Sequence, residues 1–174
     1  MDNIFLDKNI ENLLAREGEV MACSAGVSMY PMLRNKKDMI VVETVKRKLR
    51  KYDVPLYRLE SGKLVLHRII KVNPDHYVIR GDNLTVKEYI YPDQIIGVLK
   101  SFYRGGKFVD CEKSKKYKLY VFCVCHSYFL RYPWKKIIRP FLGKTKRFVL
   151  GKNKIFSKKT LDRRRTVCYY IVVH

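Results

Sequence analysis

The order of hydrophobic and polar residues along the chain predicts one short helix followed by a series of strands. Between residues 3 and 16, Ile4, Ile10, Leu13 and Leu14 fall near one face and Gly18 follows, which is typical of a short amphipathic helix. Beyond it, the apolar residues form short runs rich in β-branched side chains, which favour strands. The predicted strands cover residues 20–23, 39–43, 63–72, 77–80, 95–103 and 107–109.

Turn-forming residues separate these runs and indicate a mainly β domain. Ser61-Gly62, Asn73-Pro74-Asp75 and Gly105-Gly106 each stand between two predicted strands, as expected of an antiparallel sheet with short connections. A polar stretch at residues 110–116 then marks a change in composition. The sequence therefore predicts an antiparallel β domain over residues 1–110, with a short N-terminal helix, and a basic, partly helical C-terminal tail over residues 111–174.

Charge is concentrated in that tail. The chain has 37 Lys and Arg against 16 Asp and Glu, a net charge of +21, and from Cys111 onward there are 18 basic and 2 acidic residues. The tail also contains an apolar run at residues 119–130 and several aromatic residues. Basic and aromatic residues around an apolar run are typical of a segment that lies on an anionic membrane surface. We expect residues 117–150 to do so, with nucleic acid the less favoured partner.

Neither end of the predicted domain carries a membrane-spanning segment. The run at residues 119–130 would reach about 18 Å as a helix, which is short of the ~30 Å core of a bilayer. Residues 1–8 have acidic residues early and no long apolar stretch, unlike a secretory signal. We expect a membrane-associated, otherwise cytoplasmic protein.

The five cysteines have no regular spacing and are expected to be free thiols, because an odd count is no disulfide framework. Cys123-Val124-Cys125-His126 supplies only three candidate ligands in one local run, and small apolar residues in a hydrophobic segment explain it as well. The sequence predicts neither a metal site nor a cofactor.

Candidate chemistry begins at Gly26-Val27-Ser28-Met29-Tyr30-Pro31. A serine between a strand and a proline-containing turn can hold its hydroxyl at a rim, with backbone N–H groups free to receive an oxyanion. On its own, such a serine is usually turn chemistry.

Two further segments support Ser28. His67 lies within the predicted strand 63–72, where alternation places Val65, His67 and Ile69 on one face. Arg80-Gly81-Asp82-Asn83 follows a strand and, taken alone, is an ordinary turn.

Together, these segments resemble the signal peptidase I family, within the wider group of serine peptidases that includes LexA-like self-cleaving repressors. The nucleophile motif of that family is similar to residues 26–31, followed by Asp38 and a strand. A second box resembles residues 52–57, the strand that bears the base resembles residues 65–69, and the last box resembles residues 81–83. The four boxes occur in order between Gly26 and Gly97.

The resemblance implies a serine endopeptidase that cleaves a leader or signal segment from a precursor peptide or protein. It implies Ser28 as the nucleophile and His67 as the general base, because His67-Arg68 is similar to the serine–histidine members of the family. A neutral imidazole at pH 7 can accept the serine proton. Asp82 and Glu88 both qualify as the carboxylate that supports the histidine, with a slight preference for Asp82.

The resemblance also assigns Gly26, Met29 and Pro31 to the loop that carries the nucleophile and the oxyanion site. The chain departs from the family in lacking a predicted transmembrane helix before Ser28. Two other readings stay open. One is a catalytically silent or regulatory binding protein on the same scaffold, and the other is a basic nucleic-acid-binding protein.

Overall fold

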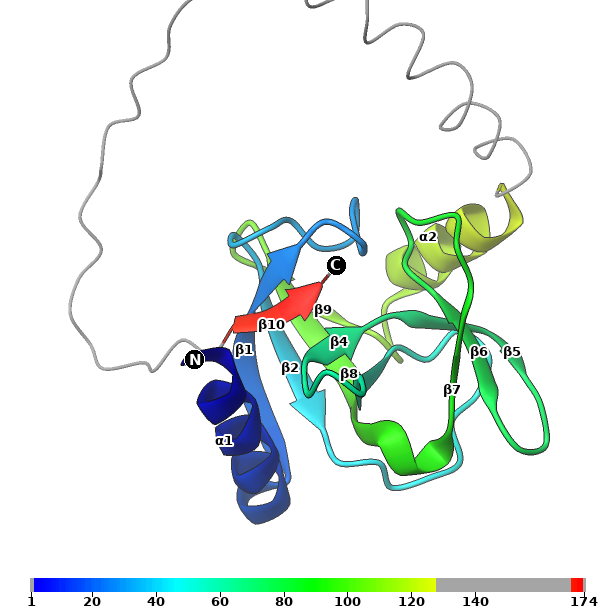
Figure 1. The fold of residues 1–174 in the computed structure, drawn as a ribbon. Coiled ribbons are helices and arrows are strands. Elements are labelled where there is room, and N and C mark those ends of the chain that lie inside the picture. The colour runs from blue at the N-terminus through cyan, green and yellow to red at the C-terminus, as the bar shows by residue number, and fades with distance from the viewer. Residues whose placement is uncertain (1, 128–169, 174) are drawn as a thin grey trace, which may run out of the picture. The chain divides into compact units, whose positions relative to one another are not determined.

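The computed structural model of the chain describes the backbone of residues 2–127 and 170–173, and the side chains of residues 10–127. The chain is mainly β, as the hydrophobic pattern predicted, and the N-terminal helix is confirmed (Figure 1). The elements are, in order, α1 (Asp2–Glu17), β1 (Glu19–Gly26), β2 (Met39–Glu43), β3 (Pro55–Arg58), β4 (Leu64–Leu66), β5 (Arg68–Val72), β6 (Tyr77–Arg80), β7 (Glu88–Ile90), a 3-10 turn (Pro92–Gln94), β8 (Ile95–Arg104), β9 (Lys107–Asp110), α2 (Lys115–His126) and β10 (Tyr170–Val173).

Seven strands form one curled sheet in the order β2-β1-β10-β4-β3-β8-β9 (Figure 1). An additional pairing between β2 and β8 joins the sheet to itself, so that six of its strands form a closed ring. The strand β10 lies between β1 and β4 and is parallel to both. All other strand pairings in the described part of the chain are antiparallel.

The segment predicted as one strand over residues 63–72 is two strands in the structure. The strand β4 pairs with β3 in the large sheet, whereas β5 pairs with β6 in a separate sheet of order β5-β6-β7. The break falls at His67, which is the residue between them. The hydrophobic pattern did not reveal it, because Leu64 to Ile69 are buried without interruption on both sides of the break.

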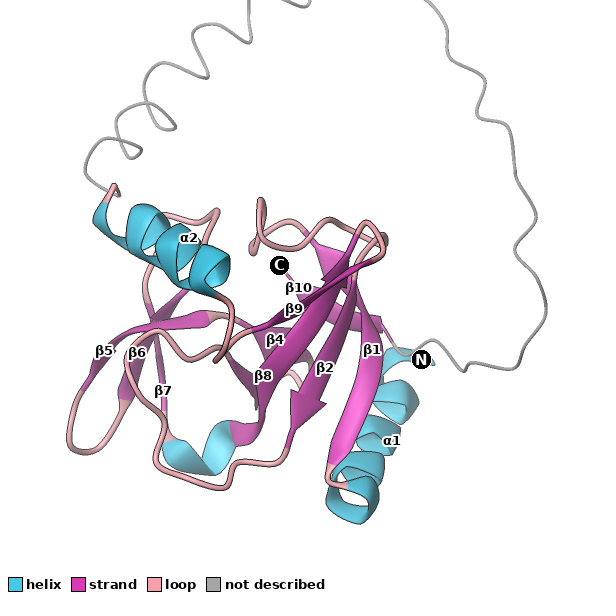
Figure 2. Ribbon diagram, turned by 180° about the vertical axis from the view of Figure 1, so that it is seen from behind, coloured by secondary structure: helices cyan, strands magenta, loops and turns pink. Residues whose placement is uncertain are grey.

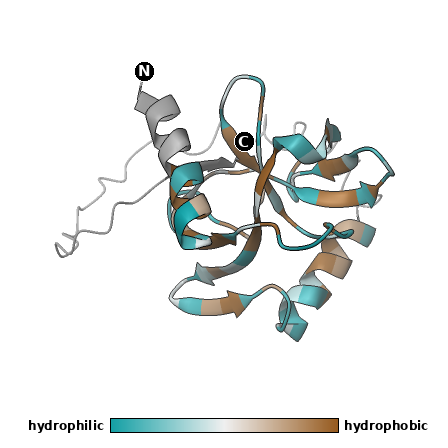
Figure 3. Ribbon diagram, turned by 90° about the horizontal axis from the view of Figure 1, so that it is seen from below, coloured by the Kyte–Doolittle hydropathy of each residue, from teal (hydrophilic) through white to brown (hydrophobic). Residues whose placement is uncertain are grey.

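Two hydrophobic clusters fill the protein. The larger one joins Ile10 and Leu14 of α1, the inner face of the large sheet, and Tyr117 and Val121 of α2. Gly97 on β8 permits this close approach, since an added Cβ would lie 2.8 Å from Leu14 Cδ2 and 2.7 Å from Val42 Cγ1. The smaller cluster lies around Tyr57 and continues into the small sheet. Figure 3 shows hydrophobic stretches within the strands and hydrophilic residues in most of the connecting loops.

Two elements of the predicted tail are described: β10, which belongs to the large sheet, and the helix α2, one face of which packs on the β domain (Figure 2). Tyr117, Val121 and Val124 are buried, whereas Leu119 and Phe122 are exposed. The chain divides into one unit of residues 1–125 with 168–174 and another of residues 126–167, which differs from a division at residue 110. No helix among the described residues is long and apolar enough to cross a membrane. Residues 128–150 of the predicted membrane-surface segment lie outside the described residues.

Candidate active site

Ser28 lies in a compact loop, residues 27–38, that connects β1 to β2. The strand β1 ends at Gly26, whose φ of 109° is readily adopted only by glycine. The loop then turns tightly, as Tyr30 N–H donates to the carbonyl of Val27 at 3.1 Å. Met29 is fully buried in the large cluster, and Pro31 follows Tyr30 through a cis peptide bond. The side chain that anchors the loop therefore sits directly beside Ser28, which is itself fully buried.

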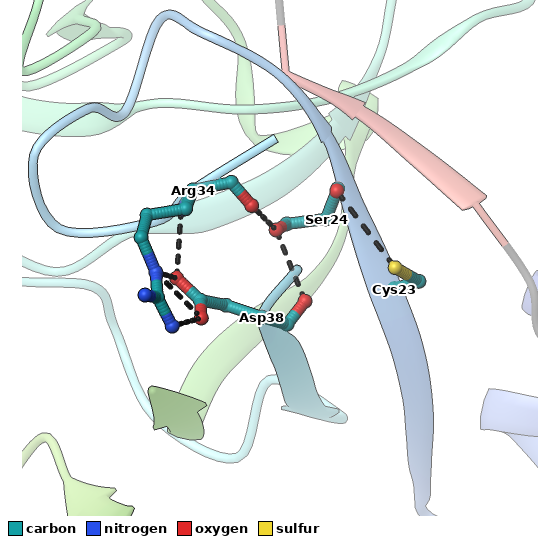
Figure 4. A network of polar contacts seen from close by, with 4 residues as sticks. All are labelled: Cys23, Ser24, Arg34 and Asp38. Carbon is teal, nitrogen blue, oxygen red and sulfur yellow. Dashed lines mark hydrogen bonds and ion pairs between the residues drawn. The ribbon is translucent and has the colours of Figure 1, made fainter. Parts of the chain in front are cut away.

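A polar network fixes the C-terminal end of this loop (Figure 4). The Arg34 guanidinium donates to both carboxylate oxygens of Asp38, at 2.6 Å from Nη2 to Oδ1 and 3.1 Å from Nε to Oδ2. Ser24 on β1 donates its hydroxyl to the Arg34 carbonyl at 3.2 Å and to the Asp38 carbonyl at 3.0 Å. Burial alone would raise the pKa of Asp38, but the hydrogen bonds from Arg34 outweigh it and lower that pKa below its usual range. The ionised carboxylate thus closes the loop on itself, and the Ser24 hydroxyl ties the loop to β1.

The Gly81-Asp82-Asn83 box holds the N-terminal end of the loop, at Val27 and Ser28. Asn83 donates its backbone N–H to the Ser28 carbonyl at 2.6 Å, and its side-chain amide donates to the Val27 carbonyl at 3.1 Å. At Gly81 an added Cβ would lie only 2.8 Å from the Ser28 carbonyl oxygen and 2.9 Å from Ser28 Cβ. The box therefore acts as a backbone clamp on the serine, and Gly81 is required there for space.

His67 faces this serine from the break between β4 and β5. Its Nε2 lies 3.0 Å from Ser28 Oγ, and the imidazole is 1% exposed. This is the distance at which a nucleophile and its general base share a proton. The structure therefore brings together the two residues that the sequence singled out, although 39 positions separate them in the chain.

The other ring nitrogen of His67 has two partners. Nδ1 lies 3.0 Å from Tyr57 Oη and 3.4 Å from Glu88 Oε2, and the Tyr57 hydroxyl donates to Glu88 Oε2 at 2.8 Å. Burial, followed by the hydrogen bond to Glu88, raises the pKa of Tyr57, so its hydroxyl keeps its proton. Because that one proton is directed at Glu88, Tyr57 can only accept from His67. Nδ1 must then carry the imidazole proton, which leaves Nε2 free to accept one from Ser28.

Asp82 does not contact His67. Its carboxylate receives two hydrogen bonds of 2.7 Å from Arg68 and one of 2.9 Å from the Tyr120 hydroxyl. Arg68 is fully buried and also donates to the Tyr117 hydroxyl at 2.9 Å. Burial would lower the pKa of Arg68, but the charge of Asp82, the interaction with Tyr117 and the hydrogen bonds to Asp82 raise it. Of the two carboxylates that the sequence left open, Glu88 lies near Nδ1 of His67, whereas the slightly preferred Asp82 is bonded to Arg68.

Sequence reasoning overlooked Tyr57, although it closes the second box of the resemblance. The available signal was a tyrosine in an otherwise apolar strand, because a buried hydroxyl needs a polar partner. The role of Arg68 was overlooked as well. It links the strand after the base to α2, through Tyr117.

Backbone donors complete the site. In the part of the chain that the structure describes, no acceptor is recorded for the N–H groups of Ser28 and Met29. Two adjacent N–H groups beside a nucleophile are suited to receive the negative oxygen of a tetrahedral intermediate. Chemically, the arrangement can deprotonate a hydroxyl and stabilise an oxyanion.

Residue types that hold metals are not gathered here. Within the described residues, no three His, Cys, Asp or Glu side chains lie together in a way that could hold an ion. Cys123 and Cys125 both lie on α2, and the four cysteines of the described range are free thiols. Burial raises the pKa of Cys111 to about 12, so that thiol stays protonated.

For the peptidase activity that the resemblance implies, we expect Gly81→Ala to lower the rate about 100-fold, because its methyl group must displace the Ser28 backbone and a shift of ~1 Å in a reacting group has that cost. The measurement is kcat for peptide hydrolysis at a temperature at which the variant is folded. Gly97→Ala is the matched control, since its Cβ would collide with β2 and α1 rather than with the serine. It should lower the melting temperature and leave kcat unchanged. Equal losses of kcat in both variants would contradict a specific role of Gly81.

Compared with protein-family models and with curated proteins, the sequence matches none.

Proposed function

We propose that this protein is a serine endopeptidase of the signal peptidase I kind, which removes a leader or signal segment from a precursor peptide or protein. The observation that carries the proposal is the 3.0 Å contact between Ser28 Oγ and His67 Nε2, with Nδ1 of the same ring held by Tyr57 and Glu88. A structural serine would not need an imidazole in this tautomer. The four boxes of the resemblance meet at this one site.

The geometry supports a two-step hydrolysis. His67 Nε2 takes the Ser28 proton while Oγ attacks the substrate carbonyl, and the N–H groups of Ser28 and Met29 receive the oxyanion. The imidazolium then gives its proton to the leaving amine, and the peptide bond breaks to form an acyl-enzyme. Water, deprotonated by the same imidazole, then attacks the acyl carbon. The ester bond to Oγ breaks, and the imidazolium returns its proton to Ser28. Glu88 stabilises the imidazolium at 3.4 Å and through Tyr57.

A pH–rate profile tests this assignment of the base. The full chain is incubated with a quenched-fluorescence peptide library that includes small residues before the cleaved bond, and the fastest substrate is used for kinetics. We expect kcat/KM to rise between about pH 6 and 7, where an imidazole ordinarily loses its proton. A rate that rises only above about pH 8.5 would instead indicate a lysine base. A silent scaffold would show no cleavage that depends on Ser28.

Membrane association through residues 117–150 belongs to the same proposal. The described part of that segment is residues 117–127, which contain most of α2 and in which Leu119 and Phe122 are 64% and 58% exposed. Lys115, Lys116 and Lys118 lie on the same helix and suit an anionic surface.

A further inference from the structure

The strand β10 differs from the rest of the sheet. It comes from the far end of the sequence, after residues 128–169, and yet it is one of the strands of the ring, between β1 and β4 (Figure 1). It alone among the described strands is parallel to its neighbours. Its neighbours do not depend on it, because β1 also pairs with β2, β4 also pairs with β3, and β8 connects those two partners. Without β10, the ring would have a strand-wide gap; we call this gap the strand groove.

The register places the strand groove beside the reacting groups. Val172 lies opposite Ala25 on β1 and opposite Val65 on β4. Because all three strands run in the same direction, Ser28 and His67 follow three and two positions later, just beyond the ends of the two wall strands. A strand advances about 3.3 Å per residue, so a chain in the groove that continues past Val173 is directed at the catalytic pair.

We propose that residues 170–173 fill the strand groove in the place of the substrate and compete with it. This inference rests on the proposed function. The ligand is an extended peptide that runs parallel to β1. The peptide bond that is cleaved follows soon after the residue opposite Gly26. Recognition of this kind uses main-chain hydrogen bonds, here to both walls, and tolerates many side chains.

The composition of residues 170–173 suits a strand, because β-branched and aromatic residues favour strands. The four residues, Tyr170-Ile171-Val172-Val173, are all uncharged. As a part of the same chain, it acts at an effective concentration that can reach the millimolar range, on the order expected for tethered ligands. A substrate in solution must therefore displace it. The protein would be active mainly toward precursors that bind tightly or that are delivered at high local concentration.

Val172→Pro in the full chain tests the proposal. Proline lacks an N–H group and is excluded from the middle of a sheet, so β10 should leave the groove. We expect KM for a short peptide substrate to fall about tenfold or more, with kcat unchanged and a cooperative thermal transition retained. A chain that ends at residue 169 should behave in the same way. Val167→Pro, outside β10, is the matched control and should leave KM unchanged.

Hydrogen exchange separates this inference from the proposed function, because it needs no activity. In a Ser28→Ala background, Val172→Pro should speed amide exchange in residues 23–26 and 64–66, and a synthetic peptide of residues 168–174 should restore the protection. Unchanged exchange, or loss of folding in both the Val172→Pro and the shortened chain, would overturn the inference and make β10 a permanent strand. If exchange changes as expected but no peptide is cleaved by any variant, strand occupancy is supported and the proposed peptidase activity fails.

Discussion

Replacing Ser28 with alanine should lower the rate of peptide-bond cleavage by about a millionfold while leaving the fold intact, since removal of a nucleophile that acts with its base has that order of effect. The hydroxyl lies 3.0 Å from the imidazole and donates to no other group that the structure records. Its removal leaves the buried Nε2 of His67 without a donor, a cost of about 1–3 kcal/mol. The clamp from Asn83 stays, because it acts on the backbone rather than on the side chain. Single-turnover kinetics with excess purified enzyme and mass-spectrometric detection give the required sensitivity.

His67→Ala should be about as inactive, and the double variant should be no worse than either single one, because the two residues act as a unit. Ser61→Ala, at an exposed turn, is the matched control and should cleave at the rate of the parent chain. Turnover that survives in Ser28→Ala would assign the activity to another residue or to a contaminant. Additive losses in the double variant would show that Ser28 and His67 do not share a proton.

The elements of the β domain were predictable because their signals are local. Runs of β-branched residues bounded by Gly, Pro or Asn gave β2, β6, β8 and β9 close to their observed bounds. The strand β10 carries an apolar signal of the same strength, but such a run contains no information about its partner strands. Its parallel position between β1 and β4 depends on a gap that only the assembled ring creates.

The candidate site could also be predicted only in part. Ser28 and His67 follow from the order of the four boxes, which is a property of the sequence. The choice between Asp82 and Glu88 does not, because both follow the base at distances that allow a contact. In the structure, the change of sheet at His67 directs Arg68 toward Asp82 and leaves Nδ1 facing β7, where Glu88 begins the strand.

Asp82→Ala should destabilise the fold by about 3–5 kcal/mol, because it leaves a buried guanidinium without its counter-charge. The side chains of Arg68 and Asp82 are 1% and 2% exposed, and two hydrogen bonds of 2.7 Å join them. The Tyr120 hydroxyl loses its acceptor as well. Since domains are stable by only about 5–15 kcal/mol, the variant should be close to unfolding at 37 °C. Urea denaturation, followed by far-ultraviolet circular dichroism, measures the loss in the free energy of unfolding.

Glu88→Gln is the matched comparison. Asp82→Ala should mainly lose stability, whereas Glu88→Gln should mainly lose activity. The Glu88 side chain is 38% exposed, so its neutralisation should change the free energy of unfolding by less than about 1 kcal/mol. It removes the charge that stabilises the imidazolium and should lower kcat by about 10- to 100-fold, with KM little changed, as general acid–base contributions of this size predict. If Asp82→Ala melted like the parent chain but lost kcat, while Glu88→Gln kept full activity, then Asp82 rather than Glu88 would be the carboxylate that positions His67. The hydrogen-bond pattern argues against that outcome, because both Asp82 oxygens are already bonded to Arg68 and Tyr120, whereas Glu88 lies within reach of Nδ1.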